Sequence, residues 1–136
     1  MRTVTVTSTA ESPSFPIDAP ANSPLSIQAD RLWQVVCGDR GHWRAGIFSP
    51  VAASLAECPE LERHTCPELF ILISGSLTLV LLKDGKVEEM PLQPERPVLV
   101  TCPHAGYCPN GPHTGRAFVV ERDAFSTVYE DLLSEK

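Results

Sequence analysis

Residues 62–75 decide the fold, and they read Glu-Arg-His-Thr-Cys-Pro-Glu followed by Leu-Phe-Ile-Leu-Ile-Ser-Gly. Successive side chains of a β-strand point to opposite faces, so Glu62, His64 and Glu68 are expected on one face. The residues that follow Glu68 are almost continuously apolar, which is typical of a buried strand. An imidazole and two carboxylates beside a buried strand form a candidate functional site.

Short runs rich in β-branched and aromatic residues continue on both sides of this stretch and are separated by Gly, Pro or Asp. These runs cover residues 32–37, 42–48, 61–66, 69–74, 76–82, 86–90, 97–102 and 116–121. Asp84-Gly85 separates two of them and predicts a type I′ hairpin turn, which needs positive φ at both central residues. Many short strands at this spacing predict an all-β protein, an antiparallel barrel or sandwich.

The two ends of the chain follow other patterns. Residues 1–30 begin with an alternating stretch, Thr3–Thr7, which predicts an edge strand that pairs within its own subunit or with a second one. The Pro-rich segment after it is typical of an extended arm or linker. Residues 31–136 form the predicted barrel domain. Its last apolar residues follow helical spacing and predict an amphipathic helix over residues 123–135.

The length and charge of the chain exclude several classes of function. Its 136 residues fit one domain. The 11 Lys and Arg residues are scattered and outnumbered by 17 Asp and Glu residues, which gives a net charge of −6. Nucleic acids and anionic membranes are bound by clustered cations, so neither partner is expected. Because no apolar run is long enough to span a bilayer or to form a signal peptide, a cytoplasmic location is expected.

Residues 62–75 resemble the first motif of the cupin family, small β-barrels in which this motif reads His-x-His-x(3,4)-Glu-x(6)-Gly. His64, Glu68 and Gly75 stand at the last three motif positions, and Glu62 stands where the family has its first His. A carboxylate can also bind a hard or borderline metal, so Glu62 stays a candidate ligand. The resemblance covers about residues 32–121 and implies a single cupin-type jelly-roll barrel.

The family's second motif ends in Pro-x-Gly-x(2)-His-x(3)-Asn and is matched less well. If Asn110 is the closing Asn, Gly106 stands at the His position. The nearest imidazole is His104, two residues earlier and on the same face of an unbulged strand. Because this segment is rich in Pro and Gly, its register is open, and either His104 or His113 could complete the site. Tyr107, next to the missing His, is a candidate acid/base group.

The resemblance implies an enzyme that acts on a small, polar, oxygen-bearing substrate through dioxygenase-, isomerase- or lyase-type chemistry. It also implies one divalent transition metal (iron, manganese, nickel or zinc) with the ligands His64, Glu68, His104 and Glu62. The candidate catalytic residues are Glu62, His64 and Tyr107, which would accept or return a proton. Small cupins are often homodimers, so a homodimer is expected.

Two alternatives keep the barrel and change the function. One is a metal-free isomerase or epimerase with a His acid/base pair, and the other is a non-enzymatic module that binds a small ligand. A different metal site also stays open, because Cys66 and Cys102 form i, i+2 pairs with His64 and His104 and could build a tetrahedral zinc site. The five cysteines are an odd number and indicate reduced thiols, with the role of Cys108 open.

Overall fold

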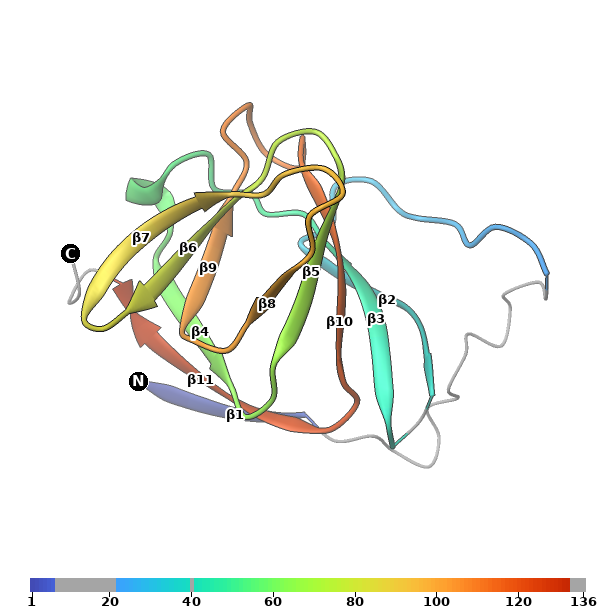
Figure 1. The fold of residues 1–136 in the computed structure, drawn as a ribbon, viewed down its shortest axis with the longest axis horizontal. Helices are drawn as coiled ribbons and strands as arrows, with labels where there is room; N and C mark the ends of the chain where they lie inside the picture. The colour runs from blue at the N-terminus through green and yellow to red at the C-terminus, as the bar shows by residue number, and fades with distance from the viewer. Residues whose placement is uncertain (7–21, 40, 133–136) are drawn as a thin grey trace.

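The computed structural model describes residues 1–6, 22–39 and 41–132, which form two antiparallel sheets that curve around a common interior (Figure 1). The first sheet has the strand order β1 (Arg2–Val6), β11 (Phe125–Asp131), β4 (Glu60–His64), β9 (His104–Tyr107), β6 (Thr78–Lys83) and β7 (Lys86–Pro91). The second has the order β2 (Trp33–Asp39), β3 (Trp43–Phe48), β10 (Arg116–Arg122), β5 (Glu68–Ser74) and β8 (Val98–Val100). A 3-10 turn, η1 (Leu55–Glu57), precedes β4. The predicted all-β architecture is confirmed.

The interior between the sheets is apolar because alternate residues of each strand face it. In β10, Ala117, Val119 and Glu121 are buried while their neighbours are not. The main core cluster consists of Phe70, Leu77, Leu79, Leu81, Leu92, Val100, Ala117 and Val119. Each large apolar side chain buried in this way contributes about 1.5–3 kcal/mol. The core therefore fixes which residues of β5 and β10 point inward, Glu68 and Glu121 included.

Two turns follow from residues that tolerate positive φ. Asp84 (φ 51°) and Gly85 (φ 77°) join β6 to β7, which confirms the predicted hairpin. Gly75 ends β5 with φ 66°, and a Cβ there would lie 2.0 Å from the carbonyl oxygen of Thr114. The glycine of the first motif is thus required both by backbone conformation and by space.

The chain ends differ in part from the predictions. The predicted N-terminal edge strand is confirmed as β1, which pairs with β11 of the same chain (Figure 1). The C-terminal helix is wrong for the residues described, because Phe125–Asp131 is strand β11. Its β-branched and aromatic residues favour a strand, and hydrogen bonds to β1 and β4 on both edges outweigh the helical spacing.

Residues 7–21, which hold most of the predicted arm, and residues 133–136 lie outside the described residues, and the domain division at residue 30 stays a prediction. Within the described ranges, no helix is long and apolar enough to cross a membrane.

Candidate metal centre

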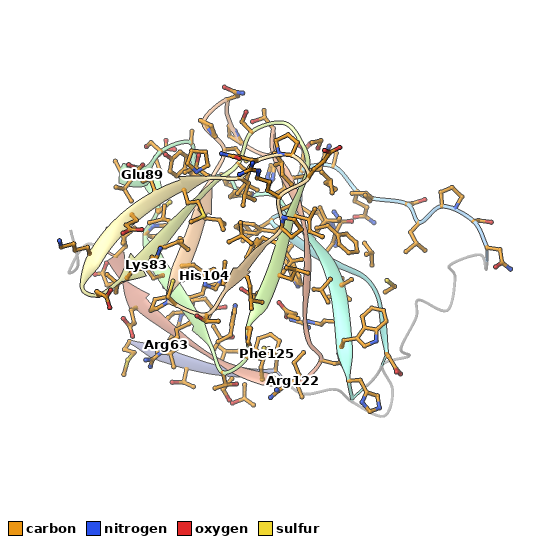
Figure 2. All side chains as sticks on the ribbon, in the orientation of Figure 1. Arg63, Lys83, Glu89, His104, Arg122 and Phe125 are labelled. Carbon is orange, nitrogen blue, oxygen red and sulfur yellow. The ribbon has the colours of Figure 1, made fainter. Side chains whose placement is uncertain are left out.

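Two neighbouring strands of the first sheet bring two imidazoles and a carboxylate together. Strand β4 carries Glu62 and His64, and β9 carries His104 directly opposite Glu62. One ligand atom from each of these three side chains lies within 4.8 Å of the other two. His104 lies inside the barrel above Phe125, whereas Lys83 and Arg63 lie on its outer side (Figure 2). The register between β4 and β9 therefore joins the two motifs that the sequence suggested.

Glu68 reaches this group from β5 in the opposite sheet. Its Oε1 lies 3.0 Å from Nε2 of His64, and its Oε2 lies 2.6 Å from Nε2 of His104. The residue is 4% exposed. Glu62 is closest to His64, with 3.5 Å between its Oε2 and the ring Nε2, and its side chain is 41% exposed. Glu68 thus contacts both imidazoles, and all four candidate ligands named from the sequence line the same cavity.

The other ring nitrogen of each imidazole has a partner behind it. Nδ1 of His104 lies 2.9 Å from the carbonyl oxygen of Cys102, to which it must donate because a carbonyl only accepts. Nδ1 of His64 lies 2.6 Å from the buried hydroxyl oxygen of Thr127. A partner on Nδ1 fixes the ring orientation and turns Nε2 toward the shared space, as in metal-binding histidines.

The fit of the site to a metal ion rests on Glu68 Oε2. This buried oxygen has no hydrogen-bond partner among the described residues, although His104 Nε2 is 2.6 Å away. If His104 donates only from Nδ1, its Nε2 turns a lone pair toward this oxygen, and a proton or a metal ion must lie between two such acceptor atoms 2.6 Å apart. Ligands about 2.0–2.2 Å from a metal lie roughly 3 Å apart at a right angle, close to the 3.0 Å contact with His64, whereas the 2.6 Å contact with His104 would lengthen when an ion binds. The donor set fits a divalent ion.

The closeness of the buried imidazoles and carboxylates sets the pKa values of His64 and Glu68. Burial lowers the pKa of His64, but the carboxylates of Glu62 and Glu68 outweigh it and raise the pKa to about 9. Burial raises the pKa of Glu68, but the imidazoles of His104 and His64 hold it well below its ordinary range. Without a bound cation, the site therefore holds a proton on His64 at neutral pH.

Two residues that sequence reasoning missed support Glu68 from behind. Glu121 of β10 is 5% exposed, and its Oε2 accepts hydrogen bonds from Arg44, 2.8 Å from Nε and 2.6 Å from a terminal nitrogen. Burial and then the hydrogen-bonded neighbour Glu68 raise the pKa of Glu121 to about 8. The Arg44 guanidinium also lies 5.0 Å from the ring centroid of Phe125. Glu121 follows Ala117 and Val119 at every second position of β10, so it points to the same buried face. This alternation was the sequence signal that could have identified Glu121.

The structure does not bring Tyr107 to the site. Its hydroxyl donates to Glu89 Oε1 at 2.8 Å, and its ring packs on a second apolar cluster around Leu61. The phenol beside the site is Tyr129 of β11, which is paired with Glu62 in register, and burial and then the Glu62 carboxylate raise the pKa of this phenol. Tyr129 was missed because residues 123–135 were predicted to be helical.

The structure also separates the two candidate histidines of the second motif. His113 donates from Nδ1 to the carbonyl oxygen of Ser49 at 2.8 Å, in a loop away from the cavity. Gly106 faces inward with His104, and a Cβ at position 106 would lie 2.7 Å from the ring of Phe48. The family's His position is thus filled by the Phe48 ring, and His104 occupies the site instead.

The cysteines do not join the candidate ligands. No disulfide joins the cysteines of the described residues, and Cys66 and Cys102 are absent from the cavity lining, so these residues do not assemble the alternative zinc site. Burial raises the pKa of the Cys66 thiol. Cys108 is buried and exchanges hydrogen bonds with the backbone of Gly115, which is a structural role.

The four candidate ligands line a cavity of about 550 Å³. Aromatic and aliphatic side chains form most of its wall, and they include Trp33, Phe48, Phe70, Val119 and Phe125. The size suits a small organic ligand. Glu62 faces the cavity, so an added molecule could touch both this carboxylate and the imidazoles.

Comparison with known proteins gives a structural likeness. No family model and no curated protein matches the sequence. The solved structure of FeII HppE has a TM-score of 0.53 at 15% identity over 79% of this chain and 59% of its own. Hydroxypropylphosphonic acid epoxidase from S. wedmorenis in complex with fosfomycin has a TM-score of 0.50 at 14% identity over 81% and 64%. This chain thus spans less than two-thirds of either structure.

A third solved structure has a size closer to this chain. It is a cupin-2 domain containing protein from Shewanella frigidimarina, with a TM-score of 0.50 at 13% identity over 71% of this chain and 84% of its own. At such identities the likeness is one of architecture, and it agrees with the two antiparallel sheets. The chain has the cupin fold, as the resemblance of residues 62–75 implied.

Proposed function

We propose that this protein is a metal-dependent cupin enzyme that acts on a small, polar, oxygen-bearing molecule. One divalent transition metal would be held by His64, His104, Glu68 and Glu62. The observation that carries the proposal is the buried Glu68 Oε2, which has no hydrogen-bond partner among the described residues and lies between two imidazoles whose Nδ1 atoms are already engaged. Solved structures with TM-scores above 0.5 include iron(II) and cobalt(II) forms of HppE, which supports a transition metal of this kind.

A bound divalent ion supplies Lewis acidity or redox chemistry to an oxygen atom of the substrate. The protein's own groups orient the substrate and move its protons. Glu62 and Tyr129 are paired in register and both line the cavity, so they are placed to take a proton from the substrate or return it. The rings of Phe70 and Phe125 wall the site and exclude water from it.

The test is elemental analysis of untagged protein purified without chelator. We expect about one equivalent of transition metal in the parent and much less in His64→Gln and His104→Gln. His42→Gln is the matched control, because His42 is exposed in the loop between β2 and β3. If the parent is empty and added manganese, iron, nickel or zinc does not raise its melting temperature, the metal proposal is wrong.

A metal-free isomerase or epimerase is the second candidate, favoured by the pKa of His64 near 9 and that of Glu121 near 8. These two groups would hold protons at neutral pH on either side of Glu68. Such an enzyme would keep its activity in chelator and show a bell-shaped pH profile. A homodimer, a cytoplasmic location and the small-molecule partner stay predictions.

A further inference from the structure

The cavity above the metal centre carries far more carboxylates than cations. Five of its lining residues are glutamates and one is an arginine. Strand β4 contributes three residues of one face, with Glu62 about 7 Å and Glu60 about 13 Å of strand length from His64. Glu57 of η1 also lines the cavity and is exposed. The exposed end of the cavity is therefore acidic.

The two arginines in and beside the cavity wall already have acceptors within the chain. Arg44 gives two donors to one oxygen of Glu121. Arg2 of β1 pairs with Glu60 at 2.8 Å, and its guanidinium lies 4.0 Å from the ring centroid of Tyr129. Glu57 accepts a backbone N–H of Ala53 and forms no ion pair within the described part of the chain. A phosphate or phosphonate dianion would therefore meet carboxylates, and the arginines near it would already be paired.

The aromatic wall suits a cation. Arg44 lies over the rings of Trp33 and Phe125, and Arg2 lies over Tyr129, so three rings of this wall already attract positive charge. At the bottom, the oxygen of Glu68 that lacks a partner among the described residues marks the position at which a ligand or ion is held. The two ends of the cavity differ in character, since the buried end offers imidazoles and the exposed end offers carboxylates.

We infer that the cavity binds a small molecule that carries a cationic amine, with the ammonium group beside Glu57 at the exposed end and an oxygen donor directed toward His64 and His104. The oxygen end of this inference rests on the proposed function, whereas the amine end rests on the cavity's own charges. An acidic wall attracts a cation during approach and also contacts it in the complex. Dianionic substrates are rejected by the same carboxylates.

The test compares three probes of equal length that differ in charge: 5-aminopentan-1-ol, pentane-1,5-diol and 5-hydroxypentanoate. Their dissociation constants are measured by calorimetry on metal-loaded protein and again on chelator-treated protein. We expect the amino alcohol to bind at least about tenfold more tightly than the hydroxy acid, with the diol between them. Equal binding of all three, preference for the hydroxy acid, or no binding of any probe at millimolar concentration overturns the inference.

Matched variants locate the preference. Glu57→Gln keeps the acceptor for the Ala53 N–H and removes the charge, so the preference for the amino alcohol should fall severalfold. Glu88→Gln is the control, because Glu88 pairs with Lys83 on the surface. If both variants leave the preference unchanged, Glu57 does not contact the amine and the inference is wrong.

The two proposals fail separately. A preference for the amino alcohol that persists in chelator, in a protein that elemental analysis finds empty, supports the amine site and removes the metal. A full equivalent of metal with no preference for the amino alcohol supports the metal site and overturns the amine site.

Discussion

Glu68 and His104 come from opposite sheets and meet with 2.6 Å between Oε2 and Nε2, yet this Oε2 has no hydrogen-bond partner among the described residues. Nδ1 of His104 donates to the Cys102 carbonyl, on the far side of the ring. The arrangement is stable when a cation contacts both atoms, and the affinity for that cation should then respond to pH.

Metal affinity should fall as the pH is lowered. His64 has a pKa of about 9 without metal, so binding at neutral pH must release its proton. The dissociation constant for cobalt(II) should rise by up to about tenfold per pH unit below pH 9. Titrations at about pH 6.5, 7.5 and 8.5 measure this, and an affinity that is constant over this range would show that His64 is not a ligand.

The stability of chelator-treated protein should have the opposite pH dependence. The pKa of His64 is raised in the folded state, so its contribution is complete below pH 6.5 and is lost as the pH approaches 9. Glu121 acts in the same direction, because its raised pKa of about 8 favours the protonated form. The free energy of unfolding should fall by about 1–3 kcal/mol between pH 6.5 and 9.

Urea denaturation at several pH values measures this slope. His64→Gln should flatten it, and His42→Gln should not. A parent protein whose stability rises with pH in chelator would contradict the assignment of these two protons.

The fold should remain stable when Glu121 is replaced by Gln and should be destabilised when it is replaced by Leu. Gln keeps an acceptor for Arg44 and a donor toward Glu68, so the free energy of unfolding should change by less than about 1 kcal/mol. Glu121→Leu leaves the largely buried Arg44 without its carboxylate and should cost about 3 kcal/mol. The double variant Arg44→Met, Glu121→Leu should recover part of this loss, and a double variant less stable than Glu121→Leu would show that the pair is not coupled.

Tyr129 and Tyr107 allow a matched comparison of a phenol beside the candidate ligands with a phenol away from them. Tyr129→Phe removes the hydroxyl beside Glu62 and should weaken cobalt(II) binding by about tenfold, as loss of a group behind a ligand does elsewhere. Tyr107→Phe loses a surface hydrogen bond to Glu89 and should leave the affinity unchanged. Equal effects of the two changes would remove Tyr129 from the site.

Substitutions at Gly75 and Gly85 test why the first motif requires a glycine at position 75. Gly75→Ala places a Cβ against the Thr114 carbonyl at positive φ, and it should lower the free energy of unfolding by more than about 2 kcal/mol. Gly85 has a similar φ, but a Cβ at this position would meet no atom within 4 Å, so Gly85→Ala should cost about 1 kcal/mol. Thermal melts of both variants decide whether crowding, rather than φ alone, requires Gly75.

The sequence predicted those parts of the site that alternation within a strand determines. Glu62 and His64 share a face of β4, and His104 shares a face of β9 with Gly106, as period-2 alternation requires. Contacts across the barrel are not encoded locally, so the Arg44–Glu121 pair behind Glu68 was not predicted. Strand β11 was missed because it is partly buried on both faces, and its apolar residues therefore match a helical spacing as well.

Glu68 belongs to the second sheet and both of its imidazole partners belong to the first. An ion held by these three side chains would cross-link the two layers of the barrel, much as a disulfide joins two segments. Separating the sheets would then require release of the ion, so amide hydrogen exchange in β5 and β9 should slow together when it binds.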